Sequence, residues 1–181
     1  KIPQFQRDYV WSKERATGLI DSILKGYPIG TFITWKTKET LRVVKNLGGV
    51  ELPPVPEGDF AEYVLDGQQR MTSLFCALKG VMIKRGKKFD NFAEIYVDLN
   101  ASEHEQIAVI DVSELAEGTY IQLTDLINSG LTVLAAFDSK YHAKLDEYKQ
   151  TLQSYNFSLI EVKDAPLDVA TEIFTRINVG G

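Results

Sequence analysis

The stretch YVLDGQQRMTSL (63–74) places the residues DGQQR (66–70) between an apolar run and an amphipathic segment. The run EYVLD (62–66) is rich in strand-forming residues, and QQRMTSLFCALKG (68–80) carries apolar residues at helical spacing. The stretch therefore predicts a strand, a tight turn at Gly67 and a helix. A simple turn needs only the Asp-Gly pair, so the two glutamines and the arginine that follow require another reason.

A strand that turns through glycine into a helix is a typical anion site, because the first helical turn has free N–H groups and a positive dipole end. Gly67 would let the backbone approach a phosphate, and Arg70 could add a planar guanidinium to its oxygens. Asp66 could ligate Mg²⁺ that bridges phosphates, and Gln68 or Gln69 could orient an attacking water. The same residues also fit a plain turn in which Asp66 caps the helix, and spacing alone leaves both interpretations open.

The rest of the chain predicts a mixture of strands and helices. The strongest helical pattern lies before Gly26, and the runs 31–36 and 41–45 are expected to pair as a hairpin. Further strands are expected at 81–84, 94–99, 119–123 and 157–162, and further helices at about 131–155 and after Pro166. Since strands and helices do not alternate regularly, the predicted fold class is α+β.

Composition bounds the possible partners. With 181 residues, 44% of them hydrophobic, one domain over 1–181 is expected. The net charge of -5 argues against a broad basic face that grips DNA. The one local basic cluster, at Lys84, Arg85, Lys87 and Lys88, favours a solvated hairpin turn, with a small DNA-backbone contact as the alternative.

The single cysteine, Cys76, excludes an internal disulfide and fits a reducing cytosol, so a cytoplasmic location is expected. No signal peptide or membrane-spanning apolar run is present, so no membrane partner is expected. The chain begins without methionine and stops in mid-motif at Gly181, which predicts an N-terminal fragment of a longer protein.

Three blocks of this sequence resemble a known family. They are IPQFQRDYVW (2–11), DGQQRMTSL (66–74) and FTRINVGG (174–181), which match the motifs I-P-x-[FY]-Q-R-x-Y-x-W, D-G-Q-Q-R-x-T-[ST]-L and F-x-R-[IL]-N-x-x-G. In this order they resemble the N-terminal domain of GmrSD-type modification-dependent restriction enzymes, which is related to the ParB/sulfiredoxin-like fold.

The resemblance implies a small mixed sheet with packed helices, Mg²⁺-dependent binding and hydrolysis of a nucleoside triphosphate, and coupling in the full-length protein to cutting of modified phage DNA. The implied catalytic group is Asp66, Gln68, Gln69 and Arg70, with Asp66 as metal ligand; Gln6, Arg7, Gly67, Thr72, Arg176 and Asn178 would bind the nucleotide. In this family the nuclease usually lies in a separate C-terminal domain, and neither His104 nor His142 has partners at metal-ligand spacing, so no nuclease activity is expected in this fragment.

Two other functions fit the same residues. The first is a nucleotide-gated DNA-binding module of ParB-like type without hydrolysis, in which the ligand shifts a clamp or homo-oligomer equilibrium. The second is DNA cleavage by the ParB-like fold itself, for which Asp8 is the one other obvious carboxylate near Asp66. Cys76 is expected to be a small core residue rather than a sulfiredoxin-like nucleophile. Trp35 is expected to lie in the core.

Overall fold

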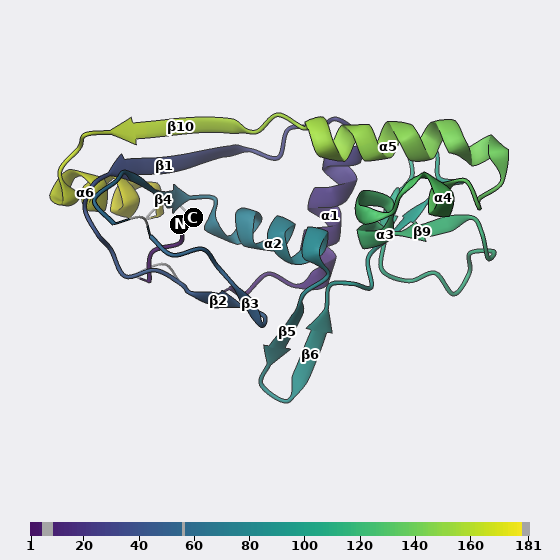
Figure 1. Cartoon of the computed structure of the whole chain (residues 1–181), viewed down its shortest axis with the longest axis horizontal. Helices are drawn as coiled ribbons and strands as arrows, with labels where there is room; N and C mark the ends of the chain where they lie inside the picture. Colours follow the sequence, from purple (N-terminus) through teal and green to yellow (C-terminus); the bar gives the residue numbers. More distant parts are fainter. Residues whose placement is uncertain (5–8, 56, 179–181) are drawn as a thin grey trace. The chain divides into compact units, whose positions relative to one another are not determined.

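The computed structural model describes residues 1–4, 9–55 and 57–178, and its fold class is α+β, as predicted (Figure 1). Contacts divide the chain into two compact units, and each is built from separate stretches of sequence. The first unit holds Lys1–Val10, Gly30–Met71 and Phe157–Gly181, and the second holds Trp11–Ile29 and Thr72–Asn156. The single domain over 1–181 and the ParB/sulfiredoxin-like assignment stay predictions.

The first unit contains a three-stranded sheet in the order β10-β1-β4. Strand β1 (Thr31–Thr37) pairs in parallel with β10 (Ser158–Lys163) and antiparallel with β4 (Ala61–Asp66). A short antiparallel pair, β2 (Asn46–Leu47) and β3 (Val50–Glu51), precedes β4. The predicted strands at 62–66 and 157–162 are therefore confirmed.

The predicted hairpin between 31–36 and 41–45 is wrong. Val43 instead forms a bridge with Pro3 of the opening segment. The Tyr63 hydroxyl, which donates to the Glu39 carbonyl at 3.0 Å and accepts from the Leu41 N–H at 3.0 Å, holds the chain after β1. Strand β4, in which four of six residues are buried, occupies the edge of β1 that a hairpin would have used.

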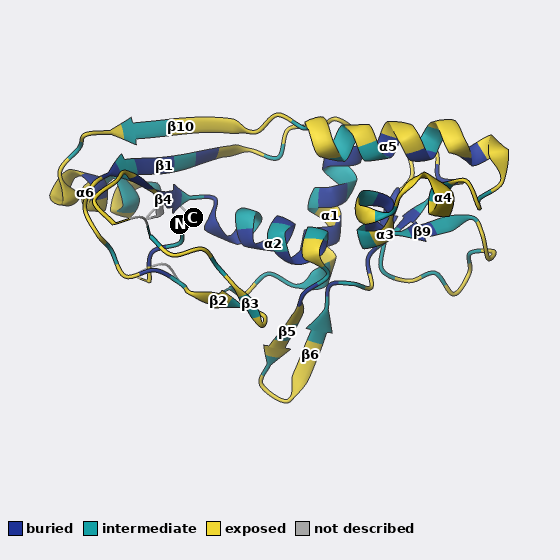
Figure 2. Cartoon of the chain, viewed as in Figure 1, coloured by how far each residue is buried: buried dark blue, intermediate teal, exposed yellow. Residues whose placement is uncertain are grey.

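The core of the first unit forms around Trp35, which is fully buried as predicted. Its indole N–H donates to the Ala165 carbonyl at 2.9 Å, and its ring lies 6.0 Å from that of Tyr63. Helix α6 (Leu167–Asn178) begins after Pro166, also as predicted, and packs on this cluster through Ala170. Figure 2 shows that β1 is mostly buried or intermediate, whereas β10 at the edge of the sheet is mostly exposed.

The second unit is built on helix α1 (Lys13–Leu24), the predicted helix before Gly26. Its sheet has the order β8-β7-β9, formed by β7 (Tyr96–Asp98), β8 (Ala108–Val109) and β9 (Tyr120–Gln122). A separate hairpin joins β5 (Met82–Arg85) to β6 (Lys88–Asn91). Helix α3 (Leu123–Asn128) follows β9 directly.

The single helix predicted over 131–155 is wrong. The structure has α4 (Leu131–Leu134), a 3₁₀ turn η1 (Ser139–Tyr141) and α5 (His142–Ser154). The break has a local cause, because the Asp138 carboxylate accepts a hydrogen bond from the Lys140 N–H at 3.0 Å and starts a new helical segment.

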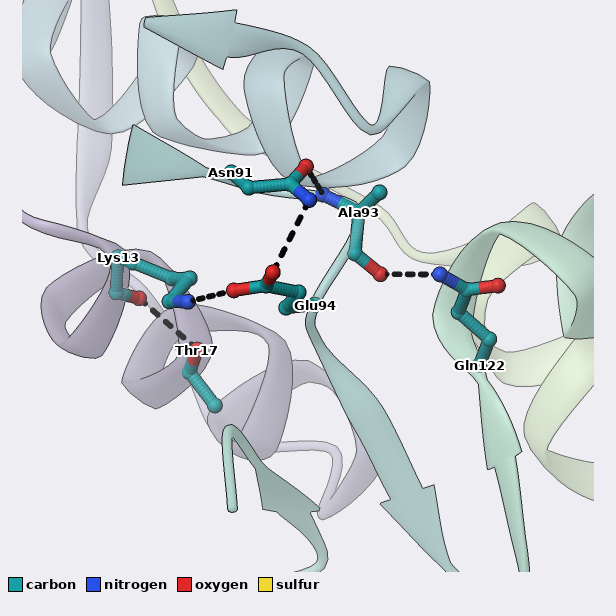
Figure 3. A network of polar contacts seen from close by, with 6 residues as sticks. All are labelled: Lys13, Thr17, Asn91, Ala93, Glu94 and Gln122. Atoms are coloured by element: carbon teal, nitrogen blue, oxygen red, sulfur yellow. Dashed lines mark hydrogen bonds and ion pairs between the residues drawn. The ribbon is translucent and has the colours of Figure 1, made fainter. Parts of the chain in front are cut away.

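A polar network fixes the base of the β5–β6 hairpin (Figure 3). Glu94 forms an ion pair with Lys13 of α1 at 2.6 Å and accepts a hydrogen bond from the Asn91 amide at 3.1 Å. The Gln122 amide at the end of β9 donates to the Ala93 carbonyl at 2.6 Å. The base of the hairpin is therefore held by contacts with both α1 and the end of β9.

Candidate functional site

The DGQQR corner has the strand–turn–helix geometry that the sequence predicts. Strand β4 ends at Asp66, Gly67 has φ +88°, and helix α2 (Gln68–Lys79) begins at the next residue. A Cβ on Gly67 would lie 2.6 Å from Cδ1 of Phe32, so this position needs glycine for space as well as for conformation. The Gly67 carbonyl accepts the Met71 N–H at 2.9 Å, which ties the turn to the opening turn of α2.

The Arg70 side chain is held by contacts with Thr31, Phe32 and Asp66. Its Nη2 donates to the Thr31 carbonyl at 2.9 Å and lies 3.1 Å from the Asp66 carboxylate. The guanidinium also lies over the Phe32 ring, 5.0 Å from its centroid. These contacts set the direction of the cation beside the helix N-terminus.

The two glutamines form a buried pair. Gln68 and Gln69 are 7% and 6% exposed, and the Gln69 Nε2 donates to the Gln68 Oε1 at 2.7 Å. The Val10 N–H donates to the Gln69 Oε1 at 2.9 Å, so the first sequence block reaches the second through a hydrogen bond. The predicted ligands Gln6 and Arg7, and Asp8, lie outside the described residues.

Thr72 lies one turn into α2 and is 1% exposed. Among the residues that the structure describes, its hydroxyl has no hydrogen-bond partner. A buried hydroxyl without a partner costs about 1–3 kcal/mol, so this is a position that a bound polar group would satisfy.

Within the described ranges 1–4, 9–55 and 57–178, no hydrogen bond or ion pair joins the third block, FTRINVGG (174–181), to the DGQQR corner. The Arg176 side chain is 79% exposed and forms an ion pair with Glu172 at 2.6 Å on its own helix. Asn178 ends α6, and its side chain lies outside the description. The roles of Arg176 and Asn178 in nucleotide binding stay predictions.

Asp66 is the candidate metal ligand of the corner. In the described part of the chain, no group of three or more His, Cys, Asp or Glu residues could hold a metal ion. Asp66 nevertheless fits Mg²⁺, because its carboxylate is one-third exposed and Mg²⁺ commonly takes one carboxylate together with substrate phosphates and waters. His104 and His142 are both exposed.

Sequence reasoning missed Gly30 and Phe32. Gly30 has φ +91°, and a Cβ there would lie 2.2 Å from Arg70 Nη1, so the guanidinium packs directly on its backbone. Phe32 supports the same guanidinium and meets Phe157 edge to face, with ring centroids 5.8 Å apart. The one available signal was a glycine just before a predicted strand, which does not reveal a partner 40 residues away.

Cys76 is fully buried, as predicted, and burial raises the pKa of its thiol to about 12, although the nearby Arg85 cation opposes the shift. We expect no alkylation by iodoacetamide in the native protein at pH 8.5 and rapid alkylation in urea, measured by mass spectrometry. The neutral thiol stabilises the fold fully below the unfolded pKa, roughly 8.5, and this contribution is lost as the pH rises toward 12. Cys76→Ala should remove that part of the pH dependence; an unchanged slope would contradict the assignment.

None of the helices in the described residues is long and apolar enough to cross a bilayer. A family model described as "GmrSD restriction endonuclease, N-terminal domain" matches residues 1–181. An uncharacterized protein from Methanocaldococcus jannaschii is 32% identical over 217 residues, an alignment that covers 99% of this chain and 36% of the relative. The chain thus spans about a third of the length of this curated relative.

Proposed function

The chain belongs to the family of GmrSD restriction endonuclease N-terminal domains, and on this premise we propose that it binds and hydrolyses a nucleoside triphosphate within a restriction protein directed at modified phage DNA. The observation that carries the proposal is the DGQQR corner. A glycine turn at φ +88° leads into a 12-residue helix, with a cation, a carboxylate and two buried amides beside the helix N-terminus.

The corner's residues divide the work. The first amides of α2 and the Arg70 guanidinium bind phosphate oxygens, and Arg7 and Arg176 are proposed to add charge from the other blocks. A phosphate would compete with Asp66 for Arg70, which frees the carboxylate to hold Mg²⁺. The bound ion would neutralise charge on the phosphate oxygens.

The two glutamines are not equivalent in this proposal. Gln69 uses its carbonyl oxygen for the Val10 N–H and its amide nitrogen for Gln68. Within the described residues, the Gln68 side chain bonds Gln69, and in that bond the Gln68 Oε1 is the acceptor. We therefore assign the water-orienting role to Gln68, through its amide nitrogen, and the positioning role to Gln69.

A second function is favoured by one specific observation. The Val10–Gln69 hydrogen bond ties the opening segment to the start of α2, so a ligand at the corner could shift that segment without being hydrolysed. In this alternative the chain is a nucleotide-gated DNA-binding module.

The test is phosphate release by the 181-residue chain with each of the four nucleoside triphosphates and Mg²⁺. We expect release with at least one of them and a loss of at least about 10-fold in Asp66→Asn. Asp168→Asn, an exposed carboxylate at the start of α6, is the matched control and should behave as wild type. Tight nucleotide binding without release would favour the switch, and neither binding nor release would overturn both functions.

A further inference from the structure

We propose that the β5–β6 hairpin, with its turn at Gly86 and Lys87, is an arm that enters a groove of duplex DNA. DNA as the partner rests on the proposed function, whereas the surface itself rests on the charges and side chains of the arm. The sequence favoured a solvated turn here, and the structure adds three observations that favour the alternative.

The first observation is the distribution of charge. Lys84, Lys87 and Lys88 are all exposed, and no ion pair or hydrogen bond to their ammonium groups is recorded within the described residues. The fourth cation, Arg85, is neutralised by Asp90 at 2.5 Å and also donates to the Trp11 carbonyl. Three uncompensated cations therefore gather at the tip of an arm on a protein of net charge -5.

The second observation is that these cations lie on both faces of the ribbon. Directly opposed residues in an antiparallel pair point to the same face, and the register pairs Lys84 with Phe89 and Arg85 with Lys88. Lys84 and Lys88 therefore project from opposite faces, with Lys87 in the turn between them. A flat membrane or a single strand would meet one face, whereas a ribbon inside a groove has a phosphate row on each side.

The third observation is an exposed apolar pair on the outer face. Phe89 and Met82 are 59% and 52% exposed, whereas Phe92, three residues further along the same chain, is fully buried at the base. Phe89 lies opposite Lys84 in the register, so an aromatic ring and a cation share one face of the ribbon. In a groove the long Lys84 side chain would reach the phosphate row on this side, and the shorter Phe89 and Met82 side chains would meet the edges of sugars and bases beside it.

The arm is also fixed well enough to be presented to a ligand. Arg85 and Asp90 brace its inner face, and the Lys13–Glu94–Asn91 network holds its base (Figure 3). A two-residue turn with Gly86 at φ +61° closes the tip, which suits the twist of a hairpin. A braced two-stranded ribbon of this width is one of the elements that a major groove admits.

The experiment measures fluorescence anisotropy of a labelled 20-base-pair DNA duplex with the 181-residue chain over a range of salt concentrations. The triple variant Lys84→Gln, Lys87→Gln, Lys88→Gln should bind at least about 10-fold more weakly at low salt. The slope of log affinity against log salt should fall by about 2.7, since each phosphate contact contributes about 0.9. Phe89→Ser should weaken binding and leave that slope unchanged.

A charge-matched control separates the arm from the general field of the protein. The triple variant Lys38→Gln, Lys45→Gln, Lys79→Gln removes three exposed cations elsewhere and should retain wild-type affinity and slope. Equal losses in the two triple variants, or no binding of the duplex by the wild-type chain, would overturn the proposal. Tighter binding to single-stranded DNA than to the duplex would also overturn it. The same holds if the arm variants lose affinity for anionic phospholipid vesicles but not for the duplex.

Phosphate release measured on the same samples distinguishes this inference from the proposed function. The arm variants should hydrolyse nucleotide as the wild type does, because none of the substituted residues lies at the DGQQR corner. If the chain binds DNA through the arm but neither binds nor hydrolyses nucleotide, the proposed function is refuted and the DNA-binding role of the arm stands. Hydrolysis at DGQQR with no role for the arm in DNA binding would do the opposite.

Discussion

Replacing Arg70 with alanine is expected to lower nucleotide hydrolysis by at least about 100-fold. A donor that stabilises developing charge on a transferred phosphoryl group is worth about 2.7–4 kcal/mol, which corresponds to that loss. Arg70 is already aimed before a ligand binds, because the Thr31 carbonyl and the Phe32 ring fix its guanidinium. Its contribution should therefore fall mainly on turnover, measured as phosphate release at saturating nucleotide and Mg²⁺.

The same contacts mean that Arg70→Ala should also cost stability, by about 1–3 kcal/mol, since a charged hydrogen bond and an ion pair are removed. Turnover must therefore be compared at a temperature where circular dichroism shows both proteins fully folded. Arg42→Ala, which removes an exposed arginine of the same unit, is the control and should keep wild-type turnover. Arg70→Lys keeps the charge but not the planar fork, so it should recover little activity. A folded Arg70→Ala protein with wild-type turnover would refute the assignment.

The elements that were predicted correctly are those that local pattern determines. The apolar spacing before Gly26 and after Pro166 defines α1 and α6, and the DGQQR stretch defines the end of β4 and the start of α2. Each depends on residues within a few positions of one another, so periodicity and turn chemistry suffice.

Strand partners depend on residues far apart in the chain, and there the sequence was insufficient. Residues 41–45 have the composition of a strand, but their pairing was decided by Tyr63, whose hydroxyl holds the Glu39 and Leu41 backbone, and by β4, which occupies the neighbouring edge of β1. The break at Asp138, by contrast, has a local cause that composition does not reveal. The bond from the Lys140 N–H to the Asp138 carboxylate interrupts a stretch, 131–155, whose composition is helical.

The candidate site divides in the same way. The geometry of Asp66, Gly67 and Arg70 follows from the local motif. The resemblance implied that Gln6 and Arg7 of the opening block belong to the same site, and the bond between Val10 and Gln69 was not part of that expectation. The support of Arg70 by Gly30 and Phe32 could not be predicted, because neither residue belongs to a motif and both lie on another strand or its approach. These supporting residues give the most direct test of how tightly the corner is built.

Gly67→Ala is accordingly expected to lower the free energy of unfolding by about 2–5 kcal/mol. An L-residue at φ +88° costs about 1–2 kcal/mol, and forcing a methyl group into a packed site adds about 1–3 kcal/mol. The new Cβ would lie 2.6 Å from Phe32, which is buried between Phe157 and the Arg70 guanidinium and so has little room to move. The measurement is urea denaturation at pH 7.

Gly49→Ala is a closely matched control, because Gly49 has φ +86° in the turn between β2 and β3 and a Cβ there would meet nothing within 4 Å. It should lose only the conformational part, about 1–2 kcal/mol. The difference between the two variants then measures the packing of Gly67 on Phe32, and Phe32→Leu combined with Gly67→Ala should recover part of it, since a smaller side chain relieves the overlap. Equal losses in Gly49→Ala and Gly67→Ala would mean that the turn is not closed against Phe32, and the fixed guanidinium on which the Arg70 prediction depends would lose its support.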